Sequence, residues 1–401
     1  MLKTALSLRC RFMTSTALRL VLVVAFTVVE ASVAVARAAS FQVLYNFGGV
    51  NTDGDHPETG LLKDKAGNLY GTTSFGGPGG AGTVFRLTPT GTETTLLSFT
   101  NKSDGGYPFA ALIQDKAGNL YGTTYEGGVS NDGVVFKLAP DGTETILHAF
   151  NGQDGQYLYG GVTIDGKGNL FGTTFQGGTG GKGVVFKIAP DKTFTVLHNF
   201  SGTDGAGSKA GLVKDAAGNL YGTTQQGGGS GAGTVFKLAP DRTLTMLHSF
   251  TQQSDGGFPT AAPILDVAGN LYGTTSAGGA GTNAGVVYKV TPTGTLTVLH
   301  TFLGDPVDGG VPVAGLIADG QGNLYGTTSA GSKGSSVRAG TVFKLAPDGT
   351  ETILHSFNGG KGGSYPAGSL ITDPADQTGY FYSTTVGGGT YKLGVIFKIH
   401  R

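Results

Sequence analysis

The residues best suited to chemistry form a small ionisable group: Asp53, Asp55, His56 and Glu58. Closely spaced carboxylates supply the oxygen ligands that Ca²⁺ takes, so a calcium-type site at Asp53, Asp55 and Glu58 is one interpretation. A histidine beside carboxylates can also exchange protons with a substrate. We place Asp55 and His56 in a predicted binding site and keep the calcium-type site as an alternative.

Aromatic and amide residues occupy two loop positions that return about every fifty residues. The position after a D-G-G motif holds, in turn, His56, Tyr107, Tyr157, Gly207, Phe258, Val311 and Tyr365. Flat apolar faces beside amide donors suit sugar rings. The predicted binding residues are Asp55, His56, Tyr107, Tyr125, Glu126, Phe175, Gln176, Gln225 and Gln226. The alternative is that the aromatic side chains fill gaps between repeats and the polar ones are only solvated.

Five histidines share one repeat position: His148, His198, His248, His300 and His355. Zinc ligands must lie about 2 Å from one ion, whereas equivalent positions in different repeats are a whole structural unit apart. We therefore expect these histidines to be structural and predict no metal site and no cofactor. The sequence contains no convincing Ser-His-Asp order or phosphate-binding loop, so the assignment of an enzymatic activity stays open, with a non-enzyme favoured.

The elements that must position these residues come from a repeat. The aromatic of an L-Y-G-T-T motif falls at Tyr70, Tyr121, Phe171, Tyr221, Tyr272, Tyr325 and Tyr382. Residues 108–150 show one unit, with short strands expected over 111–114, 120–124, 134–138 and 143–150. Turn signals at 115–119 and 140–142 predict two tight hairpins. The aspartates that open the first hairpin are expected to accept backbone hydrogen bonds; they are Asp64, Asp115, Asp165, Asp215, Asp266, Asp319 and Asp373.

Four antiparallel strands per repeat and no helical periodicity predict an all-β, seven-bladed propeller of four-stranded blades. A β-solenoid is the alternative fold. The repeats run near 48–99, 100–150, 151–200, 201–250, 251–302, 303–357 and 358–401, the last completed by 41–47. We expect segment 41–47 to pair with the C-terminal strand and close the ring, and glycines equivalent to Gly122 to permit close approach between blades. In a four-stranded meander, both irregular loops of each repeat emerge on one face.

Composition limits the class of partner. The 401 residues include 73 Gly, and 27 Lys and Arg balance 27 Asp and Glu. This is neither a disordered composition nor that of a nucleic-acid-binding protein with a basic face. Neutral carbohydrates or cell-surface proteins are the expected partners, and we expect a monomer.

The N-terminus resembles a secretory signal peptide over residues 1–39: basic residues precede the apolar run 20–29, and small residues follow. The apolar run is shorter than a spanning helix, so we expect a secreted or periplasmic protein with no membrane span in its mature chain, residues 40–401. An uncleaved signal anchor is the alternative. Cys10, the single cysteine, would be removed with the signal peptide.

The unit G-N-L-Y-G-T-T-x-x-G-G, followed by G-T-V-F-K-L-x-P-x-G, closely resembles the bacterial tandem repeats of the GloVer type. The resemblance covers essentially residues 41–401 and implies an exported repeat protein without an established activity. We expect a binding or scaffold module that acts through the irregular-loop face, with glycans as the leading ligand. The alternatives are an extracellular hydrolase, lyase or lactonase acting on a sugar or lactone near His56, Glu58 and Glu126, and a structural envelope protein.

Overall fold

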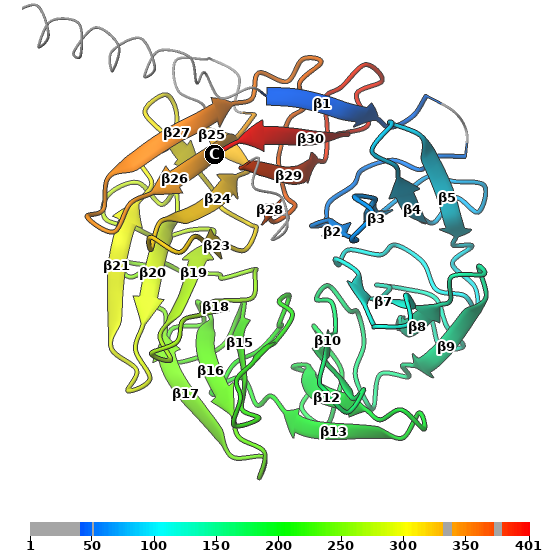
Figure 1. The fold of residues 1–401 in the computed structure, drawn as a ribbon. Coiled ribbons are helices and arrows are strands. Elements are labelled where there is room, and N and C mark those ends of the chain that lie inside the picture. The colour runs from blue at the N-terminus through cyan, green and yellow to red at the C-terminus, as the bar shows by residue number, and fades with distance from the viewer. Residues whose placement is uncertain (1–40, 50–51, 332–338, 373–378) are drawn as a thin grey trace, which may run out of the picture. The chain divides into compact units, whose positions relative to one another are not determined.

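The computed structural model describes residues 41–49, 52–331, 339–372 and 379–401. Residues 41–401 form one compact unit in which seven four-stranded antiparallel sheets are arranged as the blades of a propeller (Figure 1). The predicted all-β, seven-bladed fold is confirmed. The predicted signal peptide and Asp373 lie outside the described residues. Within the described ranges, no helix has the length and hydropathy needed to cross a membrane.

Each blade contributes an innermost strand of two residues and a longer second strand. The innermost strands of blades 1 to 7 are β2 (Leu62–Lys63), β6 (Ile113–Gln114), β10 (Thr163–Ile164), β14 (Val213–Lys214), β18 (Ile264–Leu265), β23 (Ile317–Ala318) and β28 (Ile371–Thr372). The second strands are β3 (Leu69–Thr73), β7 (Leu120–Thr123), β11 (Leu170–Thr173), β15 (Leu220–Thr224), β19 (Leu271–Thr275), β24 (Leu324–Thr328) and β29 (Tyr380–Thr385).

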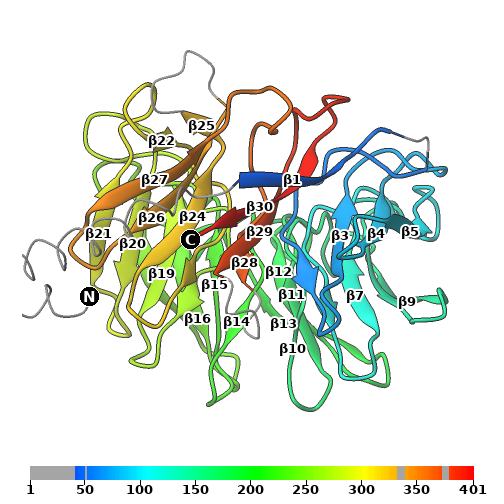
Figure 2. The same cartoon turned by 45° about the horizontal axis from the view of Figure 1, so that its top comes forward.

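The third strands are buried on both faces, and the fourth strands form the rim. The third strands are β4 (Thr83–Leu87), β8 (Val134–Leu138), β12 (Val184–Ile188), β16 (Thr234–Leu238), β20 (Val286–Val290), β26 (Thr341–Leu345) and β30 (Val395–His400). The fourth strands are β5 (Glu93–Ser98), β9 (Glu144–Ala149), β13 (Phe194–Asn199), β17 (Leu244–Ser249), β21 (Leu296–Thr301), β27 (Glu351–Ser356) and β1 (Phe41–Asn46). A small ribbon of β22 (Gly309–Gly310) and β25 (Ala330–Gly331) belongs to the loops of blade 6 (Figure 2).

Blade 7 combines segments from distant parts of the chain. Strand β1 pairs antiparallel with β30, with Phe41 opposite Ile399 and Asn46 opposite Val395, and the two strands lie side by side in Figure 1. The register shifts between Val43 and Tyr45, and the pair of third and fourth strands in every other blade has a shift of the same kind. Residues 41–46 therefore occupy the place of a fourth strand.

The core between blades is an aromatic contact repeated seven times. The phenylalanine that follows each outer strand packs edge-on against the third-strand aromatic ring of the next blade, with centroids 5.2 to 5.3 Å apart. Both members of every pair are almost fully buried. A buried aromatic side chain removes a large apolar area from water, so these pairs hold each blade to its neighbour.

The glycine of the L-Y-G-T-T motif makes room within a blade rather than between blades. Gly122 lies opposite Phe136 in the pairing of β7 with β8. A Cβ atom at Gly122 would lie only 2.5 Å from Phe136 Cζ and 2.9 Å from Leu112 Cδ2, both in the same blade. The expectation that this glycine permits approach between blades was therefore wrong: it leaves space for the aromatic ring of the adjacent strand.

The aspartate of the first hairpin organises its turn as predicted. Asp115 Oδ1 accepts hydrogen bonds from the backbone of Ala117 and Asn119, and Oδ2 accepts from the Asn119 amide and the Tyr121 hydroxyl. Burial acts to raise the pKa of Asp115, but these hydrogen bonds outweigh it and lower the pKa. The motif tyrosines of blades 1, 2, 4, 5 and 6 bind the turn carboxylate in the same way, whereas blade 3 has Phe171 at this position.

Candidate functional site

The two irregular loops of each blade lie side by side. One loop connects the fourth strand to the innermost strand of the next blade, and the other connects the second strand to the third. They are joined by bridges at Asp55 and Phe75, Gly106 and Glu126, Gln156 and Gln176, Ala206 and Gln226, Gly257 and Ala277, and Ser364 and Gly387, and in blade 6 by β22 and β25. This arrangement agrees with the expectation that both loop types share one face.

The loop position after the D-G-G motif has a left-handed backbone in all seven blades. Tyr107 has φ of 55° and Val311 also 55°, and only blade 4 uses a glycine there, Gly207. The Tyr107 N–H donates to Ala81 O, and its carbonyl accepts from Tyr125 N–H, so both sides of the residue are fixed. A strained backbone persists only where surrounding contacts determine it, and its recurrence makes it part of the architecture.

A cavity of about 340 Å³ is lined by the segments that lead into the innermost strands of all seven blades. It therefore lies on the propeller axis. Each segment contributes the residue two places after the left-handed position: Glu58, Phe109, Tyr159, Lys209, Thr260, Val313 and Ala367. Large, charged or aromatic side chains come from blades 1 to 4, and small or medium-sized ones from blades 5 to 7. The backbone segments that line the cavity are equivalent in all seven blades, but their large, charged and aromatic side chains lie on one side of it.

An aromatic cluster covers the side of the cavity formed by blades 2 to 4. Tyr125 stacks on Tyr157, with ring centroids 4.7 Å apart, and lies 4.9 Å from the ring of Tyr159. Phe109 is 5.5 Å from Tyr159, and Phe175 is 5.3 Å from it. These five residues are half-buried, so the rings pack on one another and still present part of their surface to solvent.

Lys209 completes this cluster with a positive charge. Its Nζ lies 4.6 Å from the ring centre of Tyr159 and 5.5 Å from that of Phe175, within the range of cation–π attraction. Burial lowers the pKa of Lys209. The ammonium group lines the cavity and can donate hydrogen bonds to a bound molecule.

Glu58 and Tyr159, which both line the cavity, have raised pKa values. Burial raises the pKa of Glu58, and the charge of His56 opposes this only partly. Burial, a hydrogen bond with Tyr125 and the nearby charges of Tyr125, Glu58 and Glu126 raise the pKa of Tyr159. Glu58 can therefore serve as a proton donor, and Tyr159 stays a neutral phenol.

The predicted site residues fall into three groups. Asp55 Oδ1 accepts from His56 Nδ1 at 2.7 Å, and the ring of Phe75 lies 5.7 Å from His56 and 5.4 Å from Tyr107. Asp55, His56 and Tyr107 therefore lie together in the loops of blades 1 and 2, on either side of the Phe75 ring.

The second group, Tyr125 and Phe175, belongs to the aromatic cluster. The third group is polar and does not line the axial cavity. Glu126 Oε2 accepts from the Asn101 amide, and Gln176 Oε1 accepts from Gln156 Nε2. Gln225 and Gln226 lie in the blade 4 linker, where Gln226 is exposed. The structure therefore does not gather all nine predicted residues in one place.

The calcium-type alternative at Asp53, Asp55 and Glu58 is wrong. Asp53 is buried, and its Oδ2 accepts from the Tyr45 hydroxyl and the Gly48 N–H. Asp55 pairs with His56, whereas Glu58 lines the axial cavity. Among the described residues, these three carboxylates do not form a group whose oxygens could meet at one ion.

Sequence reasoning left Phe109, Tyr159 and Lys209 out of the site. The available signal was variation at one repeat position, two residues after the D-G-G-Y aromatic, where the seven units carry seven different residues. Side-chain direction at that position depends on the left-handed backbone just before it, which a strand-and-loop pattern does not reveal.

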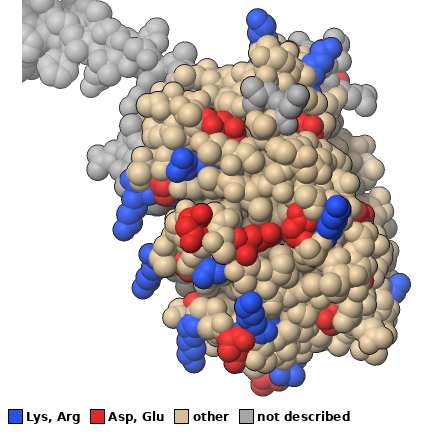
Figure 3. All heavy atoms as spheres, turned by 90° about the vertical axis from the view of Figure 1, so that its right-hand side faces the viewer, with Lys and Arg blue, Asp and Glu red and all other residues tan. Residues whose placement is uncertain are grey.

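The surface beyond the cavity carries no large field of one sign on the side shown in Figure 3. Acidic and basic side chains are both scattered there among uncharged residues. This distribution agrees with the balanced composition, and it does not resemble the continuous basic face that a nucleic acid requires.

The fold and the axial cavity define a repeat propeller with an aromatic loop face. The chain belongs to the Gloeobacter/Verrucomicrobia repeat family, whose model matches residues 32–233 and 118–337. This match confirms the resemblance drawn from the G-N-L-Y-G-T-T unit. None of the curated proteins matches the sequence.

Two solved structures of similar fold are extracellular domains of B. thetaiotaomicron BT4673. The first, described as part of a one-component system, aligns with a TM-score of 0.58 and 10% identity over 90% of this chain and 40% of that one. The second is described as part of a hybrid two-component system. It aligns with a TM-score of 0.57 and 11% identity over 89% of this chain and 39% of that one. The chain thus spans about 40% of the length of these domains, and at such identity the likeness shows the fold alone.

Proposed function

We propose that this protein is an exported carbohydrate-binding module whose ligand contacts the aromatic cluster of blades 2 to 4 at the mouth of the axial cavity. The observation that carries the proposal is the cluster of Tyr125, Tyr159 and Phe175 around Lys209. Ligand sites are typically concave and largely apolar, with a few placed polar groups. The cavity mouth has this composition on one side only.

The chemistry of the cluster favours a sugar over other ligands. Half-buried rings offer flat apolar surface to the C–H faces of a pyranose, while Lys209 and Glu58 can bond to its hydroxyl groups. Residues 1–39 carry five of the 27 basic residues and one of the 27 acidic ones, so the mature chain has 22 basic and 26 acidic residues and offers little long-range attraction for a polyanion. A neutral polysaccharide, or one with isolated carboxylates that Lys209 can contact, is the expected ligand.

Export and a monomeric state are part of the same proposal. The sequence of residues 1–39 supports export, and the likeness to extracellular domains agrees with it. In each blade the third strand is paired on both sides, and in blade 7 β1 covers β30, so no long central strand is left open for pairing with a second copy.

A hydrolase or lactonase is the second candidate, and Glu58 is the observation that favours it. Its pKa is raised by burial, and it lines the same cavity as Phe109 and Tyr159 of the aromatic cluster. A carboxyl group whose pKa is raised by burial is a better proton donor and can act as a general acid on a sugar or lactone.

The test uses the purified full chain with a panel of insoluble polysaccharides, measuring both co-sedimentation and released products. Binding without products supports the binding module, and products lost in Glu58→Gln support the hydrolase. Tyr125→Ala and Phe175→Ala should each weaken binding by about tenfold, since one aromatic contact is worth roughly 0.5–1.5 kcal/mol beyond its buried area. Phe258→Ala, at the blade 5 loop position, is the matched control and should bind as the wild type does. If the chain neither binds nor converts any member of the panel, a structural role replaces both proposals.

A further inference from the structure

The boundaries between neighbouring blades share a three-residue arrangement on the rim. The first residue is a side chain of the outer strand, the second an acid in the loop that follows it, and the third the first residue of the next outer strand. At the boundary of blades 3 and 4 these are His198, Asp204 and Leu244, and at that of blades 4 and 5 they are His248, Asp255 and Leu296. The third residue faces the histidine, as the stack of Phe194 on His148 at 3.8 Å shows.

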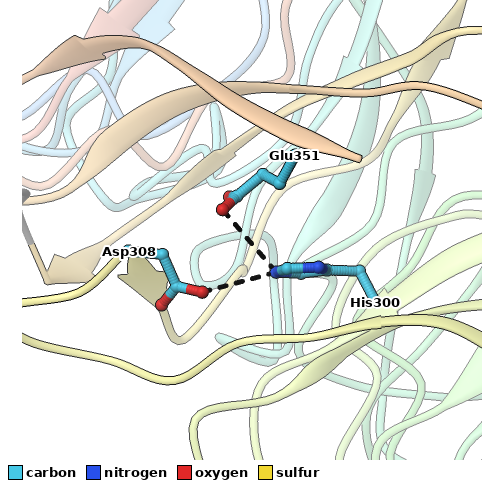
Figure 4. A group of neighbouring side chains, drawn as sticks. All are labelled: His300, Asp308 and Glu351. Atoms are coloured by element: carbon cyan, nitrogen blue, oxygen red, sulfur yellow. Dashed lines mark ion pairs between the residues drawn. The ribbon is translucent and has the colours of Figure 1, made fainter. Parts of the chain in front are cut away.

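The boundary of blades 5 and 6 differs because all three positions carry metal-ligating groups. His300 comes from β21, Asp308 from the loop after it, and Glu351 from β27 (Figure 4). One ligand atom of each lies within 4.8 Å of the other two, and within the described ranges this is the one group of three or more His, Cys, Asp and Glu side chains with that property. All three side chains are largely buried.

The distances fit a shared ion better than a hydrogen bond. The histidine Nε2 lies 2.9, 2.8 and 3.1 Å from the loop aspartate at His148, His198 and His248. At His300 the separation from Asp308 Oδ2 opens to 3.4 Å, and Glu351 Oε2 lies 3.7 Å away. Two ligands of one tetrahedral ion with bonds of about 2.0–2.1 Å are separated by about 3.3 Å. The buried Nε2 of His300 also makes no hydrogen bond.

The carboxylate of Asp308 is held in position for such a role. Its Oδ1 accepts from the N–H groups of Leu303 and Gly304, at 2.8 and 2.9 Å, which leaves Oδ2 directed to His300. Bonds of this kind to the outer atoms of a metal ligand fix its orientation and are part of the design of metal sites.

We propose that His300, Asp308 and Glu351 bind one divalent transition-metal ion of the zinc class, which ties blade 5 to blade 6. An imidazole nitrogen with two carboxylate oxygens suits Zn²⁺ and the neighbouring transition metals. The ligands come from two blades, so an ion here crosslinks β21 and its following loop with β27. The site is on the rim, separate from the axial cavity.

The test measures Zn²⁺ binding to chelator-treated full chain by calorimetry, together with the melting temperature with and without zinc. The wild type should bind one ion and melt at higher temperature with zinc. His300→Ala and Glu351→Leu should each weaken zinc binding by at least about tenfold, because removing even a supporting group of a metal site costs about that much affinity. Both substitutions should also remove the zinc-dependent rise in melting temperature. Glu351→Leu recreates the side-chain set of the blade 4 and 5 boundary, so it should fold.

His248→Ala is the matched control because it removes the equivalent histidine beside Asp255 and Leu296. It should keep the wild-type affinity for zinc. The proposal is overturned if the wild type binds zinc no more tightly than His300→Ala, or if His248→Ala loses as much affinity. If Glu351→Leu melts at a lower temperature than the zinc-free wild type, Glu351→Gln is measured instead. Zinc binding by Glu351→Gln as tight as that of the wild type would also overturn the proposal.

Discussion

The ring of Phe47 packs edge-on against the ring of Phe85 with centroids 5.2 Å apart, and this contact joins blade 7 to blade 1. Both rings are fully buried. Six further boundaries carry the same contact along the continuous chain, whereas Phe47 belongs to the segment that completes blade 7 from a distance. The seam of the ring therefore has the same packing as every other boundary.

Replacing Phe47 with alanine should destabilise the propeller strongly. A buried phenylalanine lost to alanine costs about 3–5 kcal/mol, and we expect Phe47→Ala to lower the free energy of unfolding in urea by that amount. Phe75→Ala, at a ring that is 41% exposed, should change it by less than about 1 kcal/mol. Equal effects of the two substitutions would contradict the role of the seam contact.

Deleting residues 41–47 should be more severe than the single substitution. Without β1, the third strand β30 becomes an exposed edge of six residues, and such edges promote aggregation. Thermal unfolding and light scattering of the deletion variant should show a lower melting temperature or aggregation. An unchanged melt and no scattering would mean that β1 is dispensable for closure.

The β-branched Val311 adopts a left-handed backbone with φ of 55°, a conformation that costs about 1–3 kcal/mol for such a residue. Blade 4 has Gly207 at the same place with φ of 61°. We expect Val311→Gly to raise the free energy of unfolding by about 1 kcal/mol, since relief of strain exceeds the added chain entropy. The matched change Val313→Gly, two residues away, should lower it.

Much of this fold is readable from the sequence because its repeats are regular. The L-Y-G-T-T spacing, the Asp115 turn and the Pro140 turn each specify local geometry, and seven copies leave little choice of architecture. The role of Gly122 was misjudged because spacing alone does not say whether a close neighbour belongs to the same blade or the next. That neighbour, Phe136, is set by strand register.

The candidate site was less predictable than the fold. Tyr125 and Phe175 were identified because aromatic loop residues stand out in a glycine-rich chain. Tyr159 and Lys209 were missed because their direction depends on the left-handed residue before them. The histidines looked equivalent, and Glu351 distinguishes His300 only through contact with a neighbouring blade, which lies about fifty residues away along the chain.

Lys209 gives a prediction about the ligand that rests on the proposed function. The ammonium group of Lys209 forms a charge-assisted hydrogen bond with a hydroxyl group, worth about 1.5–3 kcal/mol, and a carboxylate adds the attraction between opposite charges. Lys209→Met should therefore weaken binding of a carboxylated polysaccharide by more than about tenfold, and binding of a neutral one by a smaller factor. Lys182→Met, on the exposed part of the blade 3 linker, is the control and should leave both affinities unchanged.

His355 should make the protein sensitive to acid. Its ring stacks on Phe41 at 3.9 Å, and burial lowers its pKa to about 4, whereas the unfolded chain has the ordinary value of about 6.5. Between these values the unfolded state binds more protons, so the contribution of His355 is complete above pH about 6.5 and is lost as the pH falls towards 4.

Urea unfolding at about pH 7.5 and about pH 4.5 measures this effect through the difference between wild type and His355→Phe, which keeps a ring against Phe41. The wild type should lose roughly 1–2 kcal/mol more than the variant on acidification, after allowance for partial exposure. Glu93 and Glu144, whose pKa values burial raises to about 7, act in the opposite direction. They are present in both proteins, so their contribution cancels in the comparison. Identical pH dependence in the two proteins would show that His355 is protonated in the fold without cost.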